Sequence, residues 1–470
     1  MYVLSEESEI QARSKNKTMR FLPGVAPVKW RTLAHLESRT LGLVVVSGNS
    51  FIIPDIEISP TDFIHVKFCP ALKQTSPDGL EAIVKFTPNN SGESLTILNK
   101  NIVLNDGEKP NIEFIQLRVG EQVLGVGDIE ISCGPGPNKN SKSDWLAIIE
   151  FIVCPKELLS LARARMHTNT RRDNEIKHFT KVYKLPMFTD KKLNAFSLAQ
   201  QIVQNQIIEN PINYRQRLHE KSKQRELHVL SLCCGAARLE RSMMEGIPGT
   251  VHMTLMDINQ DLINATAEAF SEFGNVDTIC ADANLLELSP NKYDIVICVS
   301  ALHHIIELEH LIEAINTSLK DDGELWSIAE YVGRNGSMLW PDSYKEANGI
   351  FKALPDKYRM NHVKKIGEAS FDEDLPNRDC SLTTFEGIRA EDIVTILDTK
   401  LVRDTVHQWS TIIWRLLGPA YVPNYDMDND EDRGIVEDIA RKDVGYLKSG
   451  ALRPVGMRAI YKKRSSIEDM

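Results

Sequence analysis

The sequence lacks the features that mark membrane-spanning, secreted or zinc-binding proteins. No apolar run in its 470 residues approaches the roughly 20 residues of a membrane-crossing helix. The N-terminal segment 1–20 has no apolar centre of the kind that a signal peptide carries. The eight cysteines form no CxxC pair, and no His/Cys cluster has zinc-ligand spacing. We therefore expect no membrane span, no metal, reduced thiols and a cytoplasmic location.

An excess of positive charge is also missing. The chain carries 65 acidic and 55 basic side chains, and its formal net charge is −10. This balance disfavours binding to a phosphate backbone, so we expect no nucleic-acid partner. What the chain does have is an apolar content of 42%, over a length that suits about two or three domains.

Residues 41–154 are predicted to form a β domain, which follows an N-terminal extension at residues 1–40. Short β-branched runs such as LGLVVVSG and WLAIIEFIV are separated by turn-rich pieces such as SPDG and CGPGPNKNS. Because no helix-length periodicity lies between them, we predict an antiparallel β-sandwich or jelly roll. Two roles stay open for this domain: packing or homo-oligomerisation, and saccharide binding. The side chains that would contact a saccharide are Asp55, Asp62, Asn138 and Trp145.

Residues 155–225 have the apolar pattern of helices and are expected to form a helical connector. Residues 226–465 follow a different pattern, in which short apolar runs alternate with helix-like segments. Each apolar run ends in small or polar residues. This pattern predicts parallel βαβ units with a ligand site at the carboxyl ends of the strands. The segment 335–400 is expected to be an insertion that covers the substrate.

Three strand ends within this region carry candidate ligand-binding residues. The first strand leads into the turn SLCCGAAR (231–238), whose small residues allow a ligand close to the backbone. The next strand ends in Asp257, where a carboxylate can accept hydrogen bonds from both hydroxyls of a ribose. The third unit ends in Asp282, within reach of the exocyclic amine of an adenine. The fourth strand, DIVICVSALHH, ends in small residues followed by two histidines.

This succession resembles the class I S-adenosylmethionine-dependent methyltransferases over residues 225–335. The resemblance implies a Rossmann-like α/β fold with a seven-stranded sheet, and S-adenosyl-L-methionine as the cofactor. It assigns the methionine part to the turn, the ribose to the second strand end, the adenine to the third, and the region beneath the sulfonium to the fourth. The rival class, nicotinamide-binding Rossmann enzymes, favours GxGxxG where this chain has CCGAAR. The cofactor-binding residues implied in this way are Ser231, Cys233, Gly235, Ala236, Asp257, Ile258, Asp282, Ala283 and Ser300.

The first turn departs from the family pattern at three positions. Ser231 stands where the family usually has an acidic residue, and Cys233 and Ala237 stand where it has glycines. An alanine fits such a turn without strain only if its φ is negative. The departures leave open a second interpretation, in which the chain is a catalytically degenerate binding or scaffold protein with a methyltransferase fold.

Three residues are candidates for catalysis. His303 and His304 follow the fourth strand, where the methyl donor and acceptor meet in this fold, and histidine is suited to removing a proton near neutral pH. Glu330 ends the fifth strand at the same edge and is a candidate base or orienting group. Tyr331 and Arg389 are candidate substrate-binding residues. Each has a structural alternative: a helix cap, a packed ring, a carboxylate that binds loop amides, or a surface ion pair.

The phrases EYVG, LP.KYR.N and EGIR.EDI are similar to a group of bacterial methyltransferases linked with saccharide and other secondary biosynthesis. This resemblance implies O-methylation of a saccharide or a related small metabolite. A non-sugar natural product remains the alternative acceptor. A metal-assisted mechanism is conceivable for clustered carboxylates, but no fixed-spacing metal motif is present, so the prediction includes no metal.

Overall fold

The computed structural model describes most of the chain as two compact units, Met1–Thr170 and Arg171–Met470. The described residues are 1–4, 8, 10–14, 17–21, 28–32, 41–46, 49–71, 80–90, 92–102, 113–118, 123–135, 145–182, 194–247, 251–365 and 368–464.

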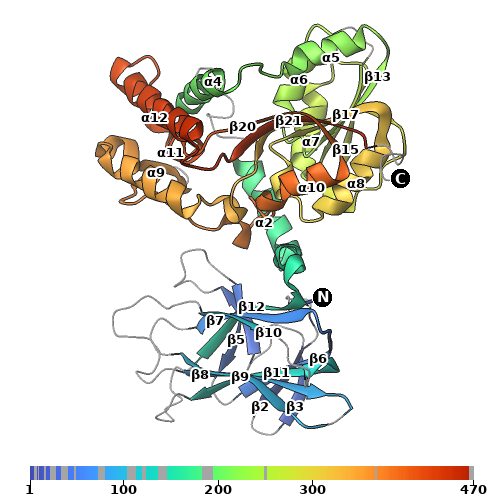
Figure 1. The fold of residues 1–470 in the computed structure, drawn as a ribbon, viewed down its shortest axis with the longest axis vertical. Coiled ribbons are helices and arrows are strands. Elements are labelled where there is room, and N and C mark those ends of the chain that lie inside the picture. Colours follow the sequence, from blue (N-terminus) through green and yellow to red (C-terminus); the bar gives the residue numbers. More distant parts are fainter. Residues whose placement is uncertain are drawn as a thin grey trace. The chain divides into compact units, whose positions relative to one another are not determined.

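Among the described residues, the first unit contains two six-stranded sheets with antiparallel pairing (Figure 1). One has the strand order β10-β7-β12-β5-β4, with β1 also paired to β12, and the other the order β3-β2-β6-β11-β8-β9. The strands of the first sheet are β1 (Tyr2–Val3), β4 (Val28–Thr32), β5 (Leu41–Val46), β7 (Asp62–Pro70), β10 (Glu113–Arg118) and β12 (Trp145–Pro155). The strands of the second are β2 (Ile10–Ser14), β3 (Lys17–Phe21), β6 (Asn49–Ile58), β8 (Leu80–Pro88), β9 (Leu95–Ile102) and β11 (Gly125–Pro135).

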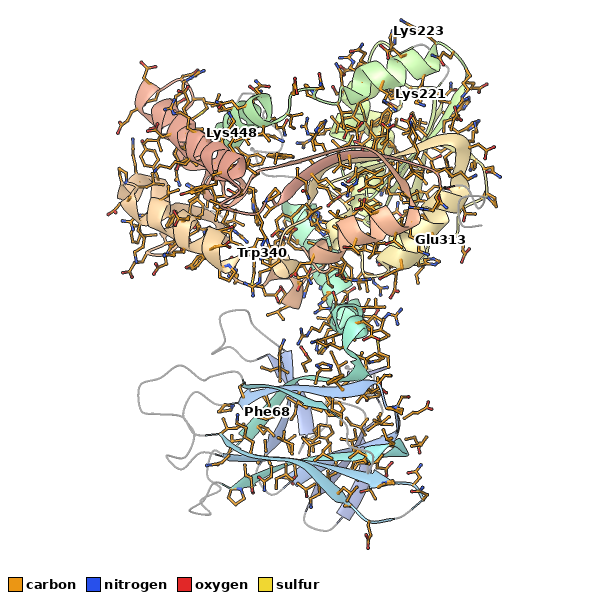
Figure 2. The ribbon with its side chains drawn as sticks, in the orientation of Figure 1. Phe68, Lys221, Lys223, Glu313, Trp340 and Lys448 are labelled. Atoms are coloured by element: carbon orange, nitrogen blue, oxygen red, sulfur yellow. The ribbon has the colours of Figure 1, made fainter. Side chains whose placement is uncertain are left out.

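The alternation of side chains explains why these segments form sheets. In β8 every second residue is buried, from Leu80 to Phe86, so one face of the strand is apolar. Buried side chains from both sheets form a single core, which includes Phe68 (Figure 2). The predicted β-rich N-terminal region is therefore confirmed, and its classification as a sandwich or jelly roll stays a prediction. Strands β1 to β4 lie within residues 1–40, the segment predicted as an extension.

The residues proposed for saccharide binding have local partners where they are described. Asp62 is buried and accepts a hydrogen bond from the Ser59 amide at 2.8 Å. Asp55 is exposed and accepts one from the Asn89 side chain at 3.1 Å. Asn138 and the side chain of Trp145 lie outside the described residues.

The second unit is organised on a seven-stranded sheet of order β15-β14-β13-β16-β17-β21-β20 (Figure 1). The first four pairings are parallel, and β21 pairs antiparallel with both β17 and β20. The strand order reverses direction between β13 and β16, which is where ligands bind in doubly wound sheets. The strands are β13 (Leu227–Leu232), β14 (Val251–Asp257), β15 (Val276–Cys280), β16 (Tyr293–Val299), β17 (Leu319–Tyr331), β20 (Val402–Trp409) and β21 (Gly456–Lys462).

Helices cover both faces of this sheet. One buried cluster joins alternate residues of β13 and β16 to α8 and α10, and another joins the opposite residues of these strands to α5, α6 and α7. Because both faces are covered, six of the seven residues of β16 are buried. The predicted Rossmann-like seven-stranded sheet is confirmed. The covering helices are α5 (Tyr214–Ser222), α6 (Arg238–Met244), α7 (Gln260–Ala269), α8 (Leu308–Ser318) and α10 (Ile393–Lys400).

A third buried cluster joins helices that come from three separate parts of the chain. They are α4 (Ala195–Ile207), α9 (Pro341–Ala353), α11 (Ile413–Leu416) and α12 (Asp430–Ser449). The predicted covering segment 335–400 thus contributes α9 to this cluster and α10 to the sheet, and it also contains the hairpin β18 (Met360–Lys365) and β19 (Glu368–Phe371). Its role as a substrate cover stays a prediction.

The described residues also include the helices α1 (Leu159–Ala164) and α2 (Thr168–Val182). From Arg171 onward, α2 belongs to the second unit, where it contacts the carboxyl end of the sheet. The Asn259 side chain donates to the Ile176 carbonyl at 3.2 Å and to the Thr180 hydroxyl at 3.0 Å. No helix within the described part of the chain has the length and apolarity to cross a membrane.

Candidate functional site

The turn after β13 is tight and bonds to the neighbouring strand. The Cys234 amide donates to the Met256 carbonyl at 2.9 Å, and the Gly235 amide donates to Asp257 Oδ2, also at 2.9 Å. The backbone takes positive φ at Cys233 (52°), Gly235 (54°) and Ala237 (46°). Alanine would be unstrained here only with a negative φ, so Ala237 is strained. A non-glycine residue in the left-handed conformation costs about 1–2 kcal/mol of conformational free energy.

Asp257 ends β14 beside this turn. Its Oδ1 accepts a hydrogen bond from the Asn259 amide at 2.8 Å, and its side chain is only slightly exposed. Burial raises the pKa of the Asp257 carboxyl, and the amides of Asn259 and Gly235 oppose this rise. Asp282 caps the short helix Ala283–Leu285, where its Oδ1 accepts from the Asn284 amide at 2.9 Å.

Ser231 does not reach the ligand side of the turn. It is fully buried, and its hydroxyl donates to Glu240 Oε1 at 2.7 Å. Glu240 lies on α6 and is itself 2% exposed, so burial raises the pKa of its carboxyl. An acidic group is thus present beside the turn, but it comes from the helix and not from the strand position where the family pattern has it.

Glu330 holds the loop that carries the two histidines. Its Oε2 accepts from the amides of Ala301 at 3.1 Å and Leu302 at 2.9 Å. Its Oε1 accepts from the His303 amide at 3.2 Å and faces His303 Nδ1 at 2.5 Å. Burial by itself would raise the pKa of Glu330, but His303 and the loop amides lower it. These contacts match the structural alternative given for Glu330, in which its carboxylate binds the amides of the following loop.

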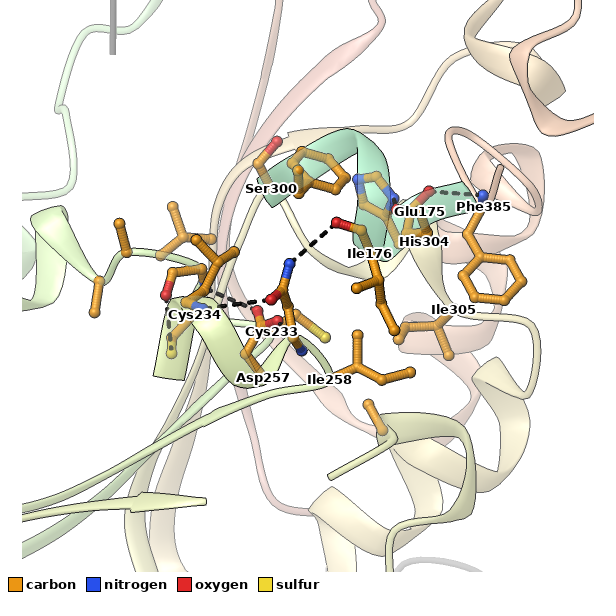
Figure 3. Close-up of a pocket in the computed structure, with 18 of the residues that line it drawn as sticks. Glu175, Ile176, Cys233, Cys234, Asp257, Ile258, Ser300, His304, Ile305 and Phe385 are labelled. Atoms are coloured by element: carbon orange, nitrogen blue, oxygen red, sulfur yellow. Dashed lines mark hydrogen bonds and ion pairs between the residues drawn. The ribbon is translucent and has the colours of Figure 1, made fainter. Parts of the chain in front are cut away.

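His304 has a second buried carboxylate beside it (Figure 3). Its Nδ1 lies 2.6 Å from Glu175 Oε1, on α2, and Glu175 also accepts from the Phe385 amide at 3.0 Å. Burial would lower the pKa of His304, but Glu175, with Glu386 and Glu330, raises it to about 9.

Glu386 faces both imidazoles. Its Oε1 lies 3.7 Å from His303 Nε2, and its Oε2 lies 3.6 Å from His304 Nε2. Ser337 donates to Oε1 at 2.5 Å and fixes the carboxylate. Burial would raise the pKa of Glu386, but the two imidazoles lower it to about 2.

Two cavities meet at this cluster. The larger, of about 490 Å³, opens over the turn and the ends of β14 and β16 (Figure 3). The second, of about 420 Å³, is lined by aromatic side chains and the end of β17. Ser300, His303 and Glu386 line both of them. A ligand in one cavity would therefore meet a ligand in the other beside the histidines.

Most predicted site residues line these cavities. Glu330 and Tyr331 line the second, and His303 lines both. Ser231 and Arg389 line neither cavity. The predicted residues that line the larger cavity are Cys233, Gly235, Ala236, Asp257, Ile258, Asp282, Ala283, Ser300, His303 and His304.

Arg389 is used in an ion-pair network. Its guanidinium donates to Glu309 Oε2 at 2.6 Å, to Asp392 Oδ2 at 2.8 Å and to the Ile306 carbonyl at 2.8 Å. Arg389 is thus engaged in ion pairs, with its own side chain buried and its partner Glu309 half exposed.

Three acidic residues of the site were not predicted from the sequence. Glu240 and Glu175 lie on helices whose local patterns give no sign of a ligand. Glu386 belongs to the EGIR phrase that signals the family resemblance, but the phrase alone assigns it no role. The useful signal would have been acidic residues on helices that lead to the carboxyl edge of the sheet.

The residues of the larger cavity fit S-adenosylmethionine. A volume of about 490 Å³ suits a ligand of this size. Asp257 and Asp282 offer carboxylates at two separate strand ends, and the turn brings small residues to the cavity wall. Glu240 adds a buried acidic group to the wall of this cavity.

Comparison with known proteins agrees with this assignment. The family described as a methyltransferase domain matches residues 229–323. No curated protein matches the chain.

The chain is also similar to solved structures, three of which have the following identities and coverages. An S-adenosylmethionine-dependent methyltransferase from Mesorhizobium loti is 13% identical, with 51% of this chain and 91% of that chain covered and a TM-score of 0.29. A methyltransferase from Bacillus halodurans, described as putative, is 14% identical, with 54% and 99% covered and a TM-score of 0.30. The [4+2]-cyclase SpnF is 16% identical, with 58% and 98% covered and a TM-score of 0.30.

The domain match and the strand-end residues lead to the same conclusion. Residues 229–323 form a class I methyltransferase domain, and S-adenosylmethionine is its cofactor.

Proposed function

We propose that the chain transfers a methyl group from S-adenosylmethionine to an oxygen atom of a saccharide or a related small metabolite. The observation that carries this proposal is the meeting of two cavities at Ser300, His303 and Glu386. The larger cavity has the residues for the methyl donor, and the second is the site we assign to the acceptor. Methyl transfer is an in-line displacement, so the alignment of donor and acceptor supplies much of the acceleration.

The lining of the second cavity supports an acceptor with both apolar faces and polar edges. Phe196, Tyr331, Trp409 and Trp414 contribute aromatic rings, and Ser410 and Gln200 contribute polar groups. The rings of Tyr331 and Trp414 meet edge to face with centroids 4.8 Å apart. Aromatic side chains combined with a few polar groups are typical of sites for small organic ligands. A saccharide, whose ring has apolar faces and hydroxyl edges, matches this lining.

The acceptor hydroxyl must lose its proton when the new carbon–oxygen bond forms and the carbon–sulfur bond breaks. We assign this activation to the cluster of His303, His304 and Glu386. Glu330 acts as a positioning residue, because both of its oxygens are bonded to the histidine loop. Tyr331 contributes its ring to the acceptor site, while its hydroxyl donates to the Arg334 and Met338 carbonyls.

Glu240 is proposed to compensate for the serine at position 231. The family pattern places a carboxylate at that strand position, near the cationic end of the cofactor. Here the Ser231 hydroxyl binds the Glu240 carboxylate at 2.7 Å, and Glu240 lines the donor cavity. An acidic side chain is therefore present at the turn without an acidic residue on the strand.

Two further parts of the proposal concern the chain as a whole. All eight cysteines are free thiols, which supports a reducing compartment such as the cytoplasm. The N-terminal unit is proposed to serve homo-oligomerisation or acceptor binding. We also propose that residues 335–400 help to cover the acceptor, since Glu386 lines both cavities.

A binding or scaffold protein without turnover is the second candidate. The positive φ at Cys233 and Ala237, where the family has glycines, favours it. This strain could weaken cofactor binding at the turn, and a scaffold role requires no turnover.

The test is calorimetric titration with S-adenosylmethionine and S-adenosylhomocysteine, followed by transfer of a labelled methyl group to saccharide and non-sugar acceptors. We expect binding of both cofactors and transfer to a saccharide hydroxyl. Absence of binding at millimolar cofactor would refute the enzyme. Binding without transfer to any acceptor class would favour the scaffold, and transfer only to non-sugar compounds would overturn the saccharide assignment.

The histidines provide a matched pair of variants. His303→Ala and His304→Ala should keep cofactor affinity, and at least one should lower turnover by about 10²–10⁴-fold. His252→Ala, at an exposed histidine that pairs with Glu226, is the control and should leave turnover unchanged. Unchanged turnover in both site variants would remove the histidines from the reaction.

A further inference from the structure

We propose that His303 Nε2, His304 Nε2 and the Glu386 carboxylate bind a first-row divalent transition-metal ion. The potential ligand atoms of these three residues all lie within 4.8 Å of one another. The carboxylate is 3.7 Å from one imidazole nitrogen and 3.6 Å from the other. Ligands at zinc-type bond lengths of about 2.1 Å and a tetrahedral angle lie about 3.4 Å apart. The two carboxylate–imidazole distances exceed this separation by a few tenths of an ångström, and the widest pair of ligand atoms would have to approach by up to about 1.4 Å to complete the site.

The outer contacts of the two histidines support metal binding. His303 Nδ1 lies 2.5 Å from Glu330 Oε1, and His304 Nδ1 lies 2.6 Å from Glu175 Oε1. Both outer carboxylates are buried. A carboxylate at one imidazole nitrogen is the usual arrangement when the other nitrogen binds a metal, because it fixes the ring and raises its basicity. His303 is held in this way by a hydrogen bond, whereas His304 Nδ1 meets Glu175 in a close ion-pair contact that lacks hydrogen-bond geometry. Both Nε2 atoms face the same third residue, Glu386.

The charge of the cluster also favours a cation. Glu175, Glu330 and Glu386 together carry a formal charge of −3 when ionised, and they surround two imidazoles whose ring centroids are 4.2 Å apart. When both imidazoles are in the neutral form that binds a metal, this charge is not compensated within the cluster. A divalent ion reduces it to −1. Two bound protons would do the same, which is why the experiment must detect the ion itself.

The ligand chemistry selects the class of metal. Two imidazole nitrogens and one carboxylate suit zinc, iron, cobalt or nickel, whereas magnesium and calcium prefer oxygen ligands. Three protein ligands leave coordination positions open, which is typical of catalytic rather than structural metal sites. The sequence gives no motif for this site, because Glu386 is supplied by a distant segment.

The position of the site suggests what the ion does, and this step rests on the proposed function. His303 and Glu386 line both cavities, so an open coordination position can face an acceptor oxygen. A divalent ion lowers the pKa of a hydroxyl that it coordinates. The hydroxyl proton then leaves to water, the oxygen forms the bond to the methyl carbon, and the electrons of the carbon–sulfur bond return to sulfur.

The experiment uses the full chain without a histidine tag, freed of metal with a chelator. Zn²⁺ and Co²⁺ are titrated separately, by calorimetry and by the visible absorption of cobalt. We expect one ion per chain. Glu386→Gln preserves the shape of the side chain and an acceptor for Ser337. It should weaken the affinity for the metal ion at least tenfold, because even residues that only hydrogen-bond to metal ligands have effects of about this size. The exposed His252→Ala variant should bind as the wild type does.

Two results would overturn the site. One is the absence of saturable binding of either ion up to millimolar concentration, and the other is equal affinity, within threefold, in the wild type and Glu386→Gln. X-ray absorption of the zinc-loaded wild type is independent of any variant and should show two imidazole nitrogens. Sulfur ligands would instead indicate the nearby Cys233 and Cys234, and would refute the assignment.

These titrations contain neither cofactor nor acceptor, so the two proposals can fail separately. Cofactor binding and methyl transfer without metal binding would leave the proposed function standing. Metal binding without methyl transfer would leave the site standing. If both hold, removing the metal should lower kcat at least tenfold and leave the affinity for S-adenosylmethionine unchanged.

Discussion

Replacing Glu330 by glutamine should loosen the loop that carries the two histidines. The carboxylate is 1% exposed and accepts hydrogen bonds through both oxygens. One oxygen binds the amides of Ala301 and Leu302, and the other binds the amide and ring of His303. A glutamine has the same shape but offers one acceptor oxygen, and its NH₂ group would face N–H donors.

The magnitude follows from the number of bonds. Whichever way the amide is turned, at least two hydrogen bonds to a charged acceptor are lost. Each contributes about 1.5–3 kcal/mol, so the loop should lose about 3–6 kcal/mol. A loss of about 3 kcal/mol corresponds to a roughly 100-fold change in an opening equilibrium.

Hydrogen exchange followed by mass spectrometry measures this opening directly, in a peptide that contains residues 301–304. Exchange of the loop amides should accelerate about 100-fold or more in Glu330→Gln. The control is Glu272→Gln, since the exposed Glu272 pairs with Arg241 at the surface and should contribute at most about 1 kcal/mol. If Glu330→Gln left the loop amides within threefold of the wild type, the carboxylate would not be what holds the loop.

Three other predictions follow from buried groups. Glu324 is paired with Arg217 and Lys221, which holds its pKa below the ordinary 4.5 despite burial. The ionised carboxylate therefore stabilises the fold above pH 4.5, and this contribution is lost as the pH falls through the lowered pKa. Urea unfolding between pH 3 and 6 should depend less on pH in Glu324→Gln, and an unchanged dependence would contradict this. Glu240→Gln should weaken S-adenosylmethionine binding about tenfold at pH 8 because it removes the acidic group that we propose to lie near the sulfonium, and S-adenosylhomocysteine should be affected less. Equal losses in calorimetry would exclude an electrostatic role. Phe351 is 1% exposed and packs edge to face on Tyr421 at 5.1 Å, so Phe351→Ala should cost about 3–5 kcal/mol in urea unfolding, and a cost below about 1 kcal/mol would show that the site is poorly packed.

Local patterns in the sequence were sufficient for the elements of the second unit. The apolar runs from Val229 to Tyr331 indicate the parallel strands of βαβ units, and the described sheet has them. The strand ends then bring Asp257, Asp282 and His303 to one edge, because parallel strands all end on the same side. The cofactor follows from these positions and from the domain match.

The first turn shows where local patterns were insufficient. The sequence identifies Ser231 and Ala237 as departures from the family, but it does not say what compensates for them. Tertiary structure brings the Glu240 carboxylate to Ser231 and holds Ala237 at a φ of 46°. The Glu240–Ser231 contact and the backbone conformation of Ala237 both depend on how α6 packs against the sheet. The spacing of residues in the sequence does not predict this packing.

By itself, the sequence determined the periodicity of the strands and helices, and with it the sheet, the cofactor edge and the position of the histidine pair. Only the tertiary structure decided what the histidines face. Glu175 arrives from α2, Glu330 from β17 and Glu386 from the segment before α10. Periodicity reports which face of an element is apolar, and so it predicts burial. Contacts between buried polar groups depend instead on how distant elements pack, and their partners are set only when the whole domain folds.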